Sequence, residues 1–118
     1  MNDSETLQKM HCTSCESGTP ALLPEQVELL LKNVPHWKLD RDRRRIHREW
    51  RAKDFDAALQ FLDRVGEVAR NEDHHPDLHL TDYRNVAIEL STHAADGLTE
   101  NDFIMAAKID ALPVELKR

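Results

Sequence analysis

The chain has 118 residues, a length that suits a single domain, and its 40% hydrophobic and 32% charged content is that of an ordinary globular protein. The formal net charge is −6, and the basic cluster at residues 41–51 is interrupted by Asp42 and Glu49, so nucleic acid is not an expected partner. No run of about 18 apolar residues is present, and residues 1–10 are polar. We therefore expect no membrane span, no secretory signal and a cytoplasmic location.

Residues 1–22 are expected to form a flexible N-terminal arm, because a turn-rich stretch, residues 16–20, lies within them. The arm carries the two cysteines, Cys12 and Cys15, in CxxC spacing, and His11 precedes them. A zinc or redox site would want a second ligand pair or a helix directly after the cysteines, and the sequence offers neither. We expect a reduced, structurally minor pair, with metal or redox chemistry as the alternative.

A helix is predicted from Pro24, since proline suits the first turn and Val27, Leu30 and Leu31 fall on one face. It ends before Pro35. A hairpin follows, with strands over residues 37–39 and 44–50. Ile46 and Trp50 share one side of the second strand, because strand side chains repeat every two residues.

A long helix is predicted after Asp54, which can cap its first turn. It ends near residues 70–71, and short strands are expected at residues 78–80 and 85–91. The apolar residues of this helix recur at spacings of three and four: Phe55, Ala58, Leu59, Leu62, Val65 and Ala69.

A last helix begins after Thr99, with Asp102 three residues on as its capping-box partner, and Pro113 stops it. The element order is αββαββα. It predicts an α+β domain over residues 23–118, with a four-stranded antiparallel sheet and three helices packed on one face.

Four of the seven histidines, His74, His75, His79 and His93, lie around the second pair of strands. Histidine gives and takes protons near neutral pH, so a cleft shared by several of them suits a reaction that adds one proton and removes another. His79 is expected on an exposed strand face. His36 and His47 have no partner in view and receive no role.

Two other interpretations of this cluster stay open. The HHxxxH spacing of His74, His75 and His79, with Asp73 and Asp77 nearby, could hold a metal. Proline at position 76 argues against the helix that such a site needs. The histidines could also serve only to fill a loop after the helix.

Several short motifs follow one another in this part of the chain: His74-His75-Pro76-Asp77, Tyr83, Ser91-Thr92-His93, Gly97-Leu98-Thr99 and Asp102. In this order they resemble the pterin-4a-carbinolamine dehydratase family, in the form seen in bacteria, and the resemblance covers roughly residues 23–114. Trp37 and Lys53-Asp54-Phe55 extend it toward the N-terminus.

The resemblance implies a dehydratase that removes water from 4a-hydroxytetrahydropterin and so recycles a tetrahydrobiopterin-type cofactor used by aromatic amino acid hydroxylases. It implies a homodimer or homotetramer and neither a metal nor an organic cofactor. His74 and His93 are the expected proton-transfer groups, and His75 the expected orienting group among the three catalytic histidines. Substrate binding is expected from His74, His75, Pro76, Thr92, His93, Ala94, Ala95 and Asp102.

Asp102 could polarise His93, contact the pterin, or only cap the last helix. Two positions depart from the family pattern: Leu78 stands where many members have tryptophan, and Arg70 where an acidic residue is common. A non-catalytic role is the alternative function, either in assembly of another enzyme such as RuBisCO or as a dimerisation factor. All three histidines are present, and a pure scaffold would not need them.

Overall fold

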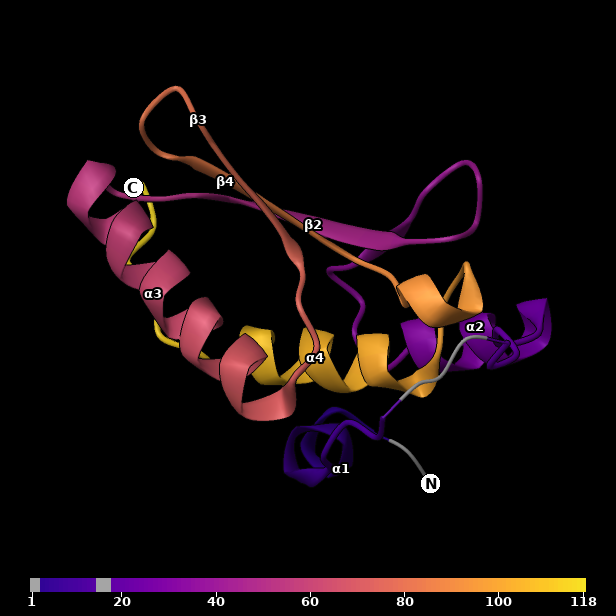
Figure 1. Ribbon diagram of the computed structural model, residues 1–118. Helices are drawn as coiled ribbons and strands as arrows, with labels where there is room; N and C mark the ends of the chain where they lie inside the picture. The colour runs from indigo at the N-terminus through magenta and orange to yellow at the C-terminus, as the bar shows by residue number, and fades with distance from the viewer. Residues whose placement is uncertain (1–2, 15–17) are drawn as a thin grey trace.

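The computed structural model describes residues 3–14 and 18–118. Figure 1 shows a twisted sheet with helices on one side of it. The elements in chain order are α1 (Ser4–Lys9), α2 (Pro24–Leu31), β1 (Lys38–Leu39), β2 (Ile46–Arg51), α3 (Phe55–Glu72), β3 (Asp77–Thr81), β4 (Asn85–Leu90), the 3₁₀ turn η1 (His93–Ala95) and α4 (Glu100–Asp110). Within the described ranges, no helix has the length and apolar character that a membrane crossing requires.

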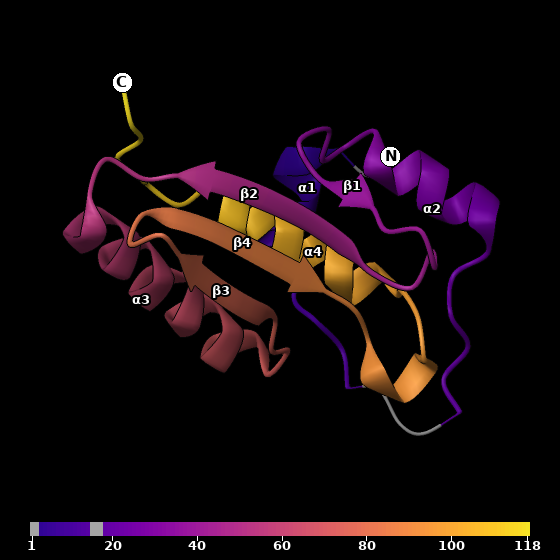
Figure 2. The same cartoon turned by 90° about the horizontal axis from the view of Figure 1, so that it is seen from above.

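The four strands form one sheet in the order β1-β2-β4-β3, and each neighbouring pair is antiparallel. Ile46 pairs with Leu90 and Trp50 with Val86, so these four buried side chains lie on the same face of the sheet. Figure 2 shows α4 running beneath that face and α3 beside β3. The predicted α+β class with an antiparallel sheet is confirmed.

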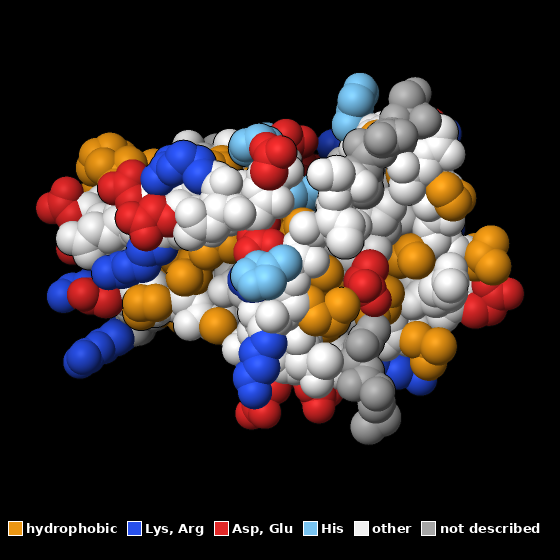
Figure 3. All heavy atoms as spheres, turned by 60° about the horizontal axis from the view of Figure 1, so that its bottom comes forward, with side chains coloured by type: hydrophobic (Ala, Val, Ile, Leu, Met, Phe, Trp, Pro, Cys, Tyr) orange, Lys and Arg blue, Asp and Glu red, His pale blue; other side chains and the backbone are white. Residues whose placement is uncertain are grey.

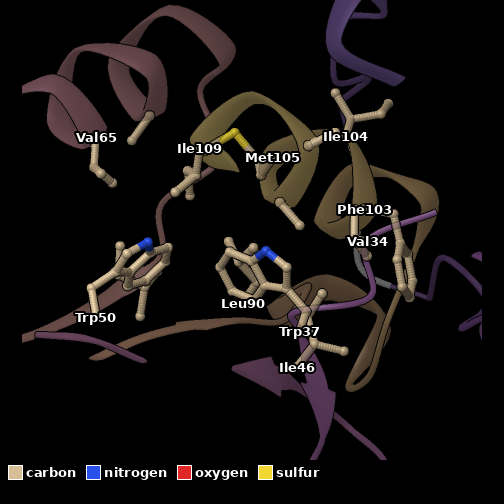
Figure 4. Close-up of a cluster of buried hydrophobic side chains, with 14 of the residues drawn as sticks. Val34, Trp37, Ile46, Trp50, Val65, Leu90, Phe103, Ile104, Met105 and Ile109 are labelled. Carbon is tan, nitrogen blue, oxygen red and sulfur yellow. The ribbon is translucent and has the colours of Figure 1, made fainter. Parts of the chain in front are cut away.

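Helix α4 lies in the middle of the core, between the sheet and α1. A helix covered on both sides must be apolar nearly all round, and α4 buries Phe103, Ile104, Met105 and Ile109. Figure 4 shows Met105 and Ile109 of α4 in one buried cluster with Trp37 and Trp50. The capping box predicted for Thr99 and Asp102 is present at its first turn.

Helix α1 lies in the segment where the sequence suggested only an extended arm. Asp3 caps it by accepting a hydrogen bond of 2.8 Å from the Thr6 N–H, and Leu7 has no exposed surface. Six residues are too few for a periodic pattern to mark a helix. Cys15, the second cysteine of the CxxC pair, falls outside the described residues.

Helix α3 starts at the predicted cap, where Asp54 accepts the Ala57 N–H at 2.8 Å. The apolar stripe predicted for it is rotated relative to the observed buried face. Phe55 and Leu59 are exposed, whereas Phe61, which the stripe omits, is fully buried. The apolar residues of α3 span more than one face, and only the packed sheet decides which part of that arc is covered.

Asp110, the last residue of α4, joins the helix to the sheet. Its Oδ1 accepts a hydrogen bond from Trp37 Nε1 at 2.8 Å and one from Arg48 Nη1 at 2.6 Å. The Arg48 guanidinium also stands 4.6 Å from the centre of the Trp50 ring. Ile46 and Trp50, predicted to share one side of their strand, are both buried, and Trp37 buries its N–H with a partner.

Candidate active site

The end of α3 sets the position of the first site histidine. Asp73 adopts a left-handed conformation (φ 50°) and ends the helix, and the N–H of His74 bonds back to the carbonyl of Ala69 at 3.2 Å. This tight closure is a common way to satisfy the last carbonyls of a helix. It turns the chain at His74 so that the imidazole reaches the first turn of α4.

His74 and Asp102 form the central contact of the site, with 2.7 Å between Nε2 and Oδ1. The Asp102 side chain has no exposed surface, and the His74 side chain is 12% exposed. The other carboxylate oxygen, Oδ2, accepts the Thr99 N–H at 3.0 Å and the Thr92 hydroxyl at 2.8 Å. One carboxylate therefore caps α4 and holds His74 at the same time.

Two threonine hydroxyl groups connect the Asp102 carboxylate to the loop that carries His93. Thr92 Oγ1 gives its single proton to Asp102, so at 2.7 Å Thr99 Oγ1 must be the donor to Thr92. Thr92 also donates its N–H to the Gly97 carbonyl at 2.8 Å. The loop between them is η1, which presents His93 to solvent.

A surface cavity of about 680 Å³ brings these groups together. Figure 3 shows histidine side chains with acidic side chains close to them on one face of the molecule. The lining residues come from four parts of the chain: Cys12, Thr13 and Ser14; Asn71, Glu72, Asp73, His74 and His75; Ser91, Thr92, His93 and Ala94; and Asn101.

The cavity includes five of the eight residues predicted to bind substrate: His74, His75, Thr92, His93 and Ala94. The other three, Pro76, Ala95 and Asp102, are not among its lining residues. Asp102 contacts His74 rather than His93.

The two positions that depart from the family pattern, Arg70 and Leu78, also lie outside the cavity lining. The Leu78 side chain is half exposed on β3. The Arg70 side chain extends back along α3 toward Gly66.

Two other histidines, His79 and His47, lie outside the cavity lining. His79 is exposed on β3 and lies 2.8 Å from Glu89 Oε1, so the HHxxxH residues do not converge. Across residues 3–14 and 18–118, no group of three or more potential ligands is placed to hold a metal ion. His47, which had no expected partner, contacts Asp40 across the first hairpin.

The arm contributes cavity residues that sequence reasoning missed. Cys12, Thr13 and Ser14 form part of the lining, and so do Glu72 and Asn101, which bind the arm. No periodicity or motif links residues this far apart in the chain, so the sequence carries no signal for this arrangement.

Known proteins that match this chain over most of its length carry names of one family. A family profile described as pterin 4 alpha carbinolamine dehydratase matches residues 20–112. A protein of Arabidopsis thaliana named pterin-4-alpha-carbinolamine dehydratase 2, mitochondrial, is 47% identical over 92% of this chain, which spans 60% of the plant protein's length. A relative from Halorhodospira halophila that carries the same family name is 46% identical over 86% of this chain and 92% of its own length.

A crystal structure is also similar. The Brucella melitensis protein described as a transcriptional coactivator/pterin dehydratase superposes with a TM-score of 0.73 at 32% identity. The match covers 77% of this chain and 96% of that one. The similarity therefore extends from sequence to three-dimensional arrangement.

Proposed function

The chain belongs to the pterin-4a-carbinolamine dehydratase family, and we propose that it removes water from a 4a-hydroxytetrahydropterin to give the quinonoid dihydropterin. The observation that carries this proposal is the cavity shared by His74, His75 and His93, in which His74 is fixed by a buried carboxylate. The names of the relatives favour this activity over a purely non-catalytic assembly role.

The reaction needs two proton transfers. The C4a hydroxyl must gain a proton so that the C–O bond can break and water can leave. The N5 proton must be removed so that its electron pair forms the new C=N bond. Groups positioned for such transfers typically speed a reaction by about 10²–10⁴-fold.

His74 is our candidate for the base that takes the N5 proton. An ionised carboxylate can only accept hydrogen bonds, so beside an ionised Asp102 the ring proton would lie on Nε2. The neutral ring then keeps a lone pair on Nδ1 for an incoming proton. The same carboxylate stabilises the imidazolium that results.

His93 is our candidate for the acid that protonates the leaving hydroxyl. It stands on the η1 turn, is exposed, and lines the same cavity as His74. Exposure gives it rapid proton exchange with water, so it can be reprotonated after each turnover. His75, exposed on the same wall as His74, is assigned to binding and orienting the pterin.

Stopped-flow absorbance on chemically generated 4a-hydroxytetrahydropterin tests the proposal. We expect a clear acceleration by the wild-type protein and at least about a 100-fold loss of kcat in His74→Ala and in His93→Ala. His79→Ala is the matched control, since His79 bonds to Glu89 outside the cavity, and it should react like wild type. A folded wild-type protein that gives no acceleration over buffer would refute the dehydratase activity.

We also propose that copies of the chain pair in solution. β3 is an edge strand of the sheet, and edge strands offer unused backbone groups to another chain. Phe55 and Leu59 add exposed apolar surface on α3. Light scattering coupled to size exclusion measures the mass directly, and a monomer at micromolar concentration would refute the pairing.

A further inference from the structure

The N-terminal arm is bound to the cavity rim by a carboxylate from α3. Glu72 Oε1 accepts the backbone N–H of Cys12 at 2.7 Å, and Glu72 Oε2 lies 2.9 Å from His11 Nδ1. The Glu72 side chain is only 6% exposed. Lys108 Nζ, from α4, stands 3.8 Å from Oε2. Both oxygens of this nearly buried carboxylate are therefore occupied by the arm and by one lysine.

A side-chain amide from α4 holds the next residue of the arm from both sides. Asn101 Oδ1 accepts the Thr13 N–H at 3.0 Å, and Asn101 Nδ2 donates to the Thr13 carbonyl at 2.7 Å. The Asn101 amide thus pairs with both backbone groups of Thr13, as the backbone of a neighbouring β-strand would. It fixes both the position and the direction of the chain at that point.

The start of the arm has its own anchor on α4. Leu7 is fully buried where α1 lies against that helix. Lys108 Nζ donates to the Gln8 carbonyl at 2.7 Å. Contacts at Leu7, Gln8, His11, Cys12 and Thr13 thus hold the arm against α3 and α4.

We propose that the docked segment of residues 12–14 is a wall of the pterin-binding cavity that contacts the substrate and sets its affinity, with Glu72 and Asn101 as the positioning residues that hold this wall in place. The inference rests on the proposed function for the identity of the ligand. Cys12, Thr13 and Ser14 line the same cavity as the three histidines. The described arm residues bind Glu72, Asn101 and Lys108, which are not the proposed proton-transfer groups, so we expect the wall to act on binding rather than on proton transfer.

Release of the wall should therefore raise KM and the dissociation constant and leave kcat nearly unchanged. For Glu72→Ala we expect about a three- to tenfold rise in both quantities, the size of one or two lost hydrogen bonds, with kcat within about twofold of wild type. Glu72→Gln keeps a carbonyl oxygen for the Cys12 N–H and should restore most of the affinity. Glu67→Ala, an exposed carboxylate on the same helix, is the matched control and should leave binding unchanged.

A second variant tests the wall without releasing the arm. Ser14→Trp places a large ring at the cavity and should weaken binding at least as much, while the bonds of Glu72 to Cys12 and His11 are left intact. Circular dichroism and thermal unfolding confirm that each variant folds. Binding is measured with biopterin, a stable oxidised pterin, by fluorescence and by titration into ¹⁵N-labelled full-length protein, where the Thr13, Ser14 and His74 amide signals should move with one dissociation constant.

The outcomes separate the wall from the reaction. If pterin shifts the amide signal of His74 but not those of Thr13 and Ser14, the proposal that residues 12–14 contact the substrate is overturned. The same holds if Glu72→Ala releases the arm but keeps the wild-type dissociation constant for pterin. Binding that moves all three signals without any turnover would refute the dehydratase activity and keep the wall. A wild-type protein that binds no pterin would overturn both.

Discussion

The imidazole of His74 and the carboxylate of Asp102 are 28 residues apart in the sequence and 2.7 Å apart in the structure. Asp102 is also the capping-box residue of α4 and accepts the Thr92 hydroxyl. The same fully buried group thus joins the end of α3, the start of α4 and the loop of His93. In the proposed mechanism, function and stability are therefore coupled at this one side chain.

Replacing Asp102 with asparagine should separate these two roles. The amide has one accepting oxygen, which can serve either His74 or the Thr99 N–H and Thr92 hydroxyl, but not both sides. We expect kcat/KM for dehydration to fall by about 100-fold or more, because the tautomer of His74 is no longer fixed. Asp63→Asn, exposed on α3, is the control. A folded variant with kcat/KM within threefold of wild type would remove Asp102 from the mechanism.

Docking of the arm should weaken in acid. Burial raises the pKa of Glu72, but the hydrogen bonds from Cys12 and His11 and the positive charge of Lys108 together hold it below its ordinary value. Because the folded pKa is the lower one, the stabilisation is complete above the unfolded pKa, about 4.3, and is lost as the pH falls through the folded pKa.

Hydrogen exchange at the Cys12 amide, measured against its intrinsic rate, reports this loss directly. Protection should decline below about pH 4.3 in the wild type. In Glu72→Gln the decline should be absent, since no carboxyl group titrates at that position. Equal pH profiles for the two proteins would contradict the assignment.

Removing the carboxylate of Asp110 should destabilise the whole domain. Asp110→Ala leaves the buried N–H of Trp37 and the guanidinium of Arg48 without their acceptor. We expect the free energy of unfolding in urea to fall by about 1–3 kcal/mol. Asp63→Ala, an exposed carboxylate, should change it by less than about 0.5 kcal/mol. A change as small for Asp110→Ala would mean that water replaces the lost acceptor.

Truncating Leu7 tests whether the arm belongs to the folded core. Leu7→Ala removes a fully buried side chain and should cost about 2–4 kcal/mol if α1 unfolds together with the domain. Leu23→Ala, at a residue 61% exposed, is the matched control and should have little effect. Urea unfolding gives both values. An unchanged midpoint for Leu7→Ala would show that α1 opens separately from the rest.

The sequence predicts the sheet and three of the helices because their patterns are local. Alternation at residues 85–90 and the proline at position 24 both mark elements that the structure contains. The short helix around Leu7 and the rotated face of α3 are not local in this sense. Their burial depends on which neighbour covers them, and one sequence does not contain that information.

Local sequence patterns likewise reveal some of the cavity residues and not others. Adjacent histidines before a proline are visible in the sequence, and the cavity includes His74, His75 and His93. The partner of His74 could not be chosen, because Asp102 also satisfied a local capping pattern. The arm's contribution at Thr13 depends on a contact with Asn101, 88 residues further on. Only the folded chain brings such residues together.

The central position of α4 has a consequence for synthesis on the ribosome. The inner face of the sheet, with Ile46 and Val86, is made well before Ile109 and the rest of its cover. Until residue 109 has left the exit tunnel, the paired strands lack the cover that α4 provides, although α3 can already pack Phe61 against Trp50. Chains interrupted before α4 should therefore be prone to aggregation and should need chaperones, whereas chains that include α4 can cover this face.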